Sequence, residues 1–140
     1  MRKIFYILVV LVTLLSSCKI GYKDKIIGEW EQVSFFEQDT MIIRWRFYAG
    51  DLLKIWMVNK SDGDKIIDLG KKDTIVYTYN IESSTFNIFT GDGSNYFFPE
   101  LQDPRGEYWV DILNNSEFKL TKQKTMNELD AYRRIELLRR

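Results

Sequence analysis

The chain has 140 residues, in which 20 Lys and Arg balance 20 Asp and Glu, and it contains no His. The lack of His excludes His-ligated zinc or haem, nucleophilic sites with a His base, and histidine pH switches. The even charge argues against nucleic acid as a partner. With one Cys and 15% aromatic residues, the composition favours a β-rich fold held by packing rather than by disulfides.

The first 17 residues have the three parts of an export signal. Arg2 and Lys3 form a positive start, Ile4–Leu15 is almost entirely apolar, and Ser16-Ser17 supplies small residues for cleavage. The apolar run is about a dozen residues long, shorter than the roughly 20 that a membrane-spanning helix needs. We therefore predict that residues 1–17 are removed, which leaves 123 residues with a net charge near −2.

The segment Leu15-Ser16-Ser17-Cys18 resembles the lipobox of bacterial lipoproteins. The resemblance implies that Cys18 receives a diacylglycerol, that the chain is cut just before it, and that the new amino group is acylated. Several acyl chains anchor a protein stably, whereas one gives only marginal binding. We expect a lipoprotein signal peptide at 1–17, a lipidated Cys and tether at 18–25, and a single domain at 26–140. An ordinary signal peptide followed by a chance Cys is the alternative.

The predicted location is the cell envelope, with the lipid anchor in the outer membrane and the domain at its periplasmic face. Lys19 follows Cys18, where some lipoproteins carry the Asp that retains them at the inner membrane, and no acidic run follows. Lys23, Lys25 and the terminal arginines are expected to gather near this anchor. Such a basic cluster would attract anionic head groups.

Eight segments beyond the tether have strand-type alternation or a β-rich composition. In the clearest, residues 41–48, alternation places Ile43, Trp45 and Phe47 on one face and Arg44 and Arg46 on the other. The eight predicted strands are residues 26–35, 41–48, 52–59, 74–81, 85–90, 108–113, 117–122 and 132–138.

The connections between these strands alternate in length. Residues 49–51, 82–84 and 114–116 suit tight hairpin turns, and the intervening connections are longer. An up-and-down antiparallel meander places all the tight turns at one end and all the long loops at the other. Closure removes exposed edge strands, and eight strands enclose an interior that side chains can fill or that can hold one small ligand. We therefore predict an all-β, eight-stranded up-and-down barrel.

The Gly28-x-Trp30 pattern at the start of the first strand resembles the lipocalin signature, and the chain from residue 26 onward resembles small lipocalin-like lipoproteins of bacteria. The resemblance implies that Trp30 packs at the closed end of the barrel beneath a basic residue from near the last strand. Arg139 is the first candidate for that residue and Arg134 the second. Gln32 departs from the family because it is polar on the face of Trp30. It is either an interior polar group or a sign of a shifted register.

Eight residues on the inward faces are candidates for lining a ligand site. Apolar walls with a few phenol hydroxyls would suit a small apolar or amphipathic ligand. The many aromatic side chains favour the alternative, a barrel that simply fills itself. The candidate residues are Trp45, Phe47, Ile55, Met57, Tyr77, Tyr79, Phe86 and Tyr108.

The longest connection, residues 91–107, contains Tyr96, Phe97 and Phe98. This triplet is a candidate lid or partner contact, or else an extended strand edge. The leading functional hypothesis is binding of a small ligand at the long-loop end. The alternative is a protein-interaction module, an inhibitor or envelope adaptor, with a filled barrel. A hydrolase acting through Asp and Glu alone comes third. No catalytic residue, metal site or cofactor is predicted, and we expect no enzymatic activity.

Overall fold

The computed structural model describes residues 21–33, 41–67, 74–90, 103–124 and 133–140. The predictions for Cys18, for the signal peptide and for Tyr96, Phe97 and Phe98 lie outside these residues. The elements are α2 (Tyr22–Ile26), β1 (Gly28–Gln32), β2 (Met41–Tyr48), β3 (Leu52–Asn59), η1 (Lys60–Asp62), β4 (Lys65–Ile66), β5 (Thr74–Ile81), β6 (Thr85–Thr90), β7 (Gly106–Leu113), β8 (Glu117–Lys122) and β9 (Arg134–Arg139).

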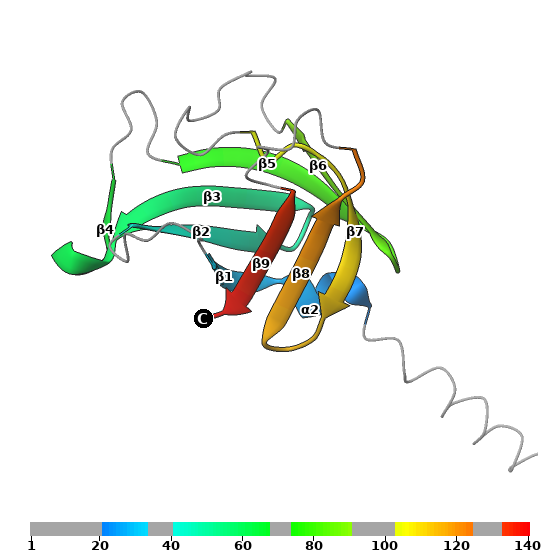
Figure 1. The fold of residues 1–140 in the computed structure, drawn as a ribbon, viewed down its shortest axis with the longest axis horizontal. Helices are drawn as coiled ribbons and strands as arrows, with labels where there is room; N and C mark the ends of the chain where they lie inside the picture. Colours follow the sequence, from blue (N-terminus) through cyan, green and yellow to red (C-terminus); the bar gives the residue numbers. More distant parts are fainter. Residues whose placement is uncertain (1–20, 34–40, 68–73, 91–102, 125–132) are drawn as a thin grey trace, which may run out of the picture.

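Eight strands form a closed antiparallel barrel, as predicted (Figure 1). Each strand of the barrel pairs with the strand before it and the strand after it, in the order β1, β2, β3, β5, β6, β7, β8 and β9. Strand β1 then closes the ring by pairing with β9 through three residue pairs, among them Trp30 with Arg139. Strand β4 is an addition that pairs with the end of β3.

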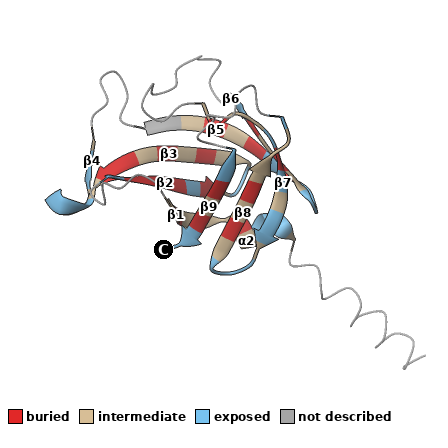
Figure 2. Cartoon of the chain, in the orientation of Figure 1, coloured by how far each residue is buried: buried red, intermediate tan, exposed pale blue. Residues whose placement is uncertain are grey.

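The alternation along the strands determines which side chains enter the barrel. In β2, Ile43, Trp45 and Phe47 are buried in the core cluster, while Arg46 on the opposite face is exposed. Strand β3 pairs with β2 along all eight residues, so that Leu53, Ile55 and Met57 continue the inward face. Figure 2 shows this periodic burial along the strands of the barrel.

Several elements differ from the prediction. Residues 22–25, predicted as tether, and Ile26, predicted as the start of the first strand, form the short helix α2, and Ile26 is completely buried. Strand β1 is therefore shorter than predicted and begins at Gly28. The predicted loop after β3 contains η1 and β4. Strands β7 and β9 each differ by one or two residues from the predicted bounds, and β7 carries a bulge between Val110 and Ile112.

Helix α2 lies at the tight-turn end of the barrel. Lys23 on α2 forms an ion pair of 2.6 Å with Asp51 in the turn between β2 and β3. At the same end, the backbone N–H of Arg139 donates to the carbonyl of Ser116 in the turn between β7 and β8. The long connections leave from the opposite end, as the meander requires. In the part of the chain that the structure describes, no helix has the length and apolar character to cross a membrane.

Candidate functional site

All eight candidate lining residues face the barrel interior and are buried. The most exposed is Met57, at 8% of its surface, and Trp45, Phe86 and Tyr108 have no exposed surface. A lumen open to water would leave its wall accessible to a water-sized sphere. These side chains therefore meet other protein atoms rather than an open channel.

Three phenylalanines from non-adjacent strands meet in the interior of the barrel. Phe47 from β2, Phe86 from β6 and Phe118 from β8 contact one another, with ring centroids 5.4 to 6.1 Å apart. The rings meet edge to face, an arrangement that aromatic quadrupoles favour. We call these three residues the phenylalanine plug. Phe118 is on the predicted inward face of its strand, but the sequence alone did not identify it as a partner of Phe47 and Phe86.

The hydroxyl groups of two interior tyrosines are already bound by the protein itself. Tyr79 donates to the carbonyl of Tyr48 at 3.1 Å, and Tyr108 donates to the carbonyl of Pro104. Burial, together with the nearby negative charge of Asp51, raises the pKa of Tyr79 to about 12. These phenols stabilise the barrel as neutral hydrogen-bond donors.

Gln32 is an interior polar group in the correct register. It shares the inward face of β1 with Trp30, and its Oε1 accepts a hydrogen bond of 2.9 Å from the indole Nε1 of Trp45. This bond gives the indole N–H and the partly buried amide oxygen a partner inside the barrel. The polar residue on the face of Trp30 is therefore explained by the Trp on the neighbouring strand.

Trp30 closes the tight-turn end together with Arg139. The Trp30 Nε1 donates to the carbonyl of Ile26 at 2.7 Å, and the Arg139 guanidinium lies 4.5 Å from the centre of the Trp30 ring. The same guanidinium donates to the carbonyls of Lys25 and Ile27. The second candidate, Arg134, is exposed and lies at the other end of β9.

The backbone conformation at Gly28, two residues before Trp30, explains why a glycine stands there. Its φ is +132°, and a Cβ built at this position would lie 2.9 Å from Nη1 of Arg139. Glycine adopts this conformation readily, whereas any larger residue would be strained here and would displace the guanidinium from its present position. Gly28, Trp30 and Arg139 therefore form one structural unit.

The long-loop end of the barrel carries a group of charged side chains. The Arg105 Nε donates to both carboxylate oxygens of Asp103, at 2.8 and 2.7 Å. Burial disfavours ionisation of Asp103, but hydrogen bonds and charge from Arg105 hold its pKa below the usual value. Lys122 reaches inward at the same end, where its Nζ lies 5.8 Å from the centre of the Tyr108 ring.

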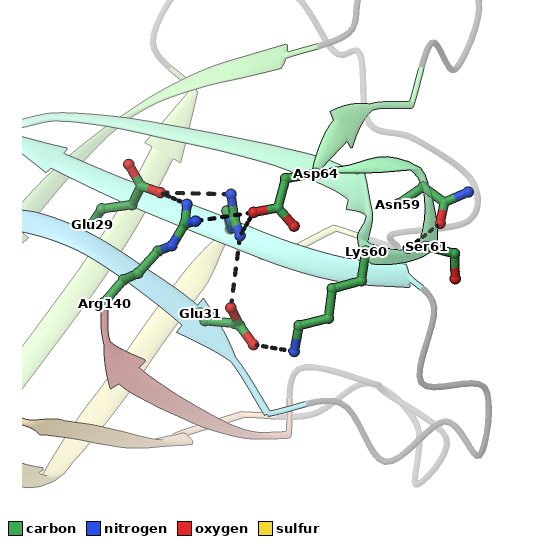
Figure 3. Close-up of polar contacts among 8 residues, drawn as sticks. Glu29, Glu31, Asn59, Lys60, Ser61, Asp64 and Arg140 are labelled. Carbon is green, nitrogen blue, oxygen red and sulfur yellow. Dashed lines mark hydrogen bonds and ion pairs between the residues drawn. The ribbon is translucent and has the colours of Figure 1, made fainter.

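An ionic network on the outer surface of the barrel was not predicted. At its centre is Arg44, which is only 5% exposed although it points away from the interior. Its Nη2 donates to Asp64 at 2.9 Å, and Glu29 and Glu31 lie 3.9 Å from its terminal nitrogens. Arg140 bridges Glu29 and Asp64, as Figure 3 shows. The network joins β1, β2, the end of β9 and the turn before β4.

Asp64 has an unusual backbone conformation, and the network lowers its pKa. Its φ is +63°, a left-handed conformation that is uncommon for residues other than Gly but is tolerated by Asp. The hydrogen bond from Arg44 and the charges of Arg44 and Arg140 keep the pKa of Asp64 below its usual value. The sequence indicated only one member of this network. Arg44 stands on the polar face of β2, but no pattern connects it to Asp64, which lies 20 positions later.

Comparison with protein-family models, with curated proteins and with solved structures gives no significant match. Within residues 21–33, 41–67, 74–90, 103–124 and 133–140, no three acidic, His or Cys side chains gather in a way that could hold a metal ion. The function must therefore be argued from the geometry of the barrel and of its two ends.

Proposed function

We propose that the protein is a lipid-anchored module of the cell envelope that recognises a partner protein through the long-loop end of its barrel. Cys18 would carry the anchor, as the lipobox resemblance implies. The phenylalanine plug is the observation that supports this function over small-ligand binding. A barrel whose interior is filled by side chains is a rigid scaffold. Recognition is then left to the surface of its long-loop end.

The charge and exposure at the long-loop end fit a role in recognition. Met41, which begins β2 there, is 50% exposed, and Lys122, Arg105 and Asp103 supply charged groups near the same end. An interface of this kind combines exposed apolar residues with charged groups around them. The tight-turn end, in contrast, carries short turns and α2.

Native mass spectrometry of the protein extracted from its own membrane tests this proposal. We expect acyl chains on an N-terminal Cys18 and a protein that copurifies in fixed stoichiometry. Met41→Asp should abolish the copurification, because it places a charge at the recognition end. Ser83→Asp, in the tight turn between β5 and β6, is the matched control and should retain the partner. Equal retention by both variants would refute recognition through the long-loop end.

Binding of a small apolar or amphipathic ligand is the second candidate. It is favoured by the apolar residues toward the long-loop end of the barrel, where Ile43 and Met57 keep a small exposed surface of 8% each and Ile67 packs against the core. Methionine adapts its shape readily, so a ligand could displace Met57 without breaking the plug. The same mass spectra decide this point, because a ligand would appear as a constant added mass that persists in Met41→Asp.

A further inference from the structure

Helix α2 is fixed to the barrel by contacts with several elements. Ile26 is fully buried in the core, and its carbonyl accepts the indole N–H of Trp30. Arg139 donates to the carbonyls of Lys25 and Ile27, and Lys23 pairs with Asp51. A helix of this length is not stable alone, so these contacts hold it in place.

The docked helix shortens the predicted tether. The sequence suggested that residues 18–25 link the lipid to the barrel, but residues from Gly21 onward belong to the folded structure. Three residue steps separate Cys18 from Gly21. Since each step spans at most about 3.3–3.6 Å, the acylated Cys cannot lie more than about 11 Å from the barrel.

The basic residues expected near the anchor contact other groups in the described part of the chain. Lys23 pairs with Asp51, Lys25 lies over the ring of Tyr22, and Arg139 is held over Trp30. Arg140 turns to the outer surface, where it pairs with Glu29 and Asp64. Because these basic groups are already engaged within the protein, we expect the covalent link, more than charge, to bring this end to the membrane.

We infer that the tight-turn end of the barrel rests on the head-group surface of the lipid bilayer, held there by the short link to Cys18 and not by charge. This inference rests on the acylation of Cys18 in the proposed function. The contact surface consists of α2 and the turns 49–51, 82–84 and 114–116. The protein then has one orientation on the membrane, with its long-loop end directed away from the lipid.

Energy transfer from single labels to head-group-labelled lipid tests the orientation. The acylated protein is placed in nanodiscs, and because Cys18 is the only natural Cys, an introduced Cys is labelled uniquely. Ser83→Cys reports on the tight-turn end and Lys124→Cys on the opposite end. Eight-residue strands are about 26 Å long, so the two labels should differ in distance by roughly 20 Å once strand tilt is allowed for. We expect strong transfer from residue 83, weak transfer from residue 124, and little change in high salt.

Insertion of ten Gly and Ser residues between Ile20 and Gly21 is the control. The longer link should reduce the difference between the two labels at least severalfold while leaving the barrel intact. Equal transfer from both labels in the acylated protein would overturn the orientation, as would a difference that disappears in high salt. The mass of the N-terminal peptide separates the two proposals, because a chain without acyl groups would overturn the anchor itself.

Discussion

At the scale of single residues, Tyr79 shows how an interior polar group can stabilise a filled barrel. Its hydroxyl is bound to the carbonyl of Tyr48, and its ring contacts Phe47 and Phe86, with centroids 5.2 and 5.9 Å away. The neutral phenol is the form that this environment favours. The residue therefore supplies packing and a hydrogen bond together, and it gives the fold a specific dependence on alkaline pH.

Tyr79→Phe tests this dependence. Near pH 8 the variant should lose about 1 kcal/mol of unfolding free energy, because the Tyr48 carbonyl loses its donor. The folded pKa of about 12 exceeds the unfolded value of 10. The wild type should therefore lose roughly 2–3 kcal/mol of stability between pH 10 and 12, where only the unfolded chain ionises at this position. Urea denaturation at several pH values measures both effects, and the variant should lack this part of the alkaline loss.

At the scale of elements, the turn that carries β4 is joined to the barrel by charge. Asp64 accepts from Arg44 and Arg140, whereas the side chain of its neighbour Asp62 is 65% exposed and pairs with Lys65 at 3.8 Å. The two carboxylates are thus a natural comparison. Because the folded pKa of Asp64 is lowered, its contribution is present above the unfolded value near 4 and is lost as pH falls through the folded value.

Asp64→Asn should loosen β4 without unfolding the barrel. Asparagine tolerates the left-handed backbone but cannot balance the charge of Arg44. At neutral pH we expect hydrogen exchange at Lys65 and Ile66 to be severalfold faster in this variant, and unchanged in Asp62→Asn. At pH 3 the difference between wild type and Asp64→Asn should narrow. An equal response of the two variants at pH 7 would show that the network does not hold the turn.

Strand positions were predictable where alternation was long and unbroken. The segment Met41–Tyr48 alternates along its whole length, and β2 has the bounds that the pattern predicts. Helix α2 was missed because it has five residues and no side-chain N-cap at Gly21, so it leaves no helical period. It forms because Ile26 is buried by other elements. Strand β4 was missed for a similar reason, since two residues carry no pattern.

The sequence predicted which side chains of the candidate site point into the barrel, but not which of them contact one another. Alternation identified Phe47 and Phe86 as inward residues, and antiparallel pairing correctly placed Arg139 beside Trp30. The distance between two inward side chains across the barrel depends on strand tilt and stagger, which no local pattern encodes. For that reason the sequence left open whether the barrel was hollow, and the plug with Phe118 became visible only in three dimensions.

At the scale of the whole molecule, the phenylalanine plug should contribute strongly to the free energy of unfolding of the barrel. Phe86 is completely buried and contacts both other members of the plug, whereas Phe89 on the same strand is 52% exposed. Phe86→Ala should cost about 3–5 kcal/mol, because truncation leaves a cavity between the side chains of Phe47 and Phe118. Phe89→Ala should stay within about 0.5 kcal/mol of wild type. Guanidinium denaturation measures both values, and similar losses would argue against a plug.

The pairing of β1 with β9 also affects how fast the protein folds. The two strands that complete the ring are at opposite ends of the domain, and the bond from Arg139 to Ile27 joins residues 112 positions apart. Contacts between such distant residues slow folding, because a large loop must close before they form. Until then β1 and β9 each keep an unpaired edge that is open to other chains. The interval between synthesis of the last strand and closure of the ring is therefore the period in which this protein is most exposed to aggregation.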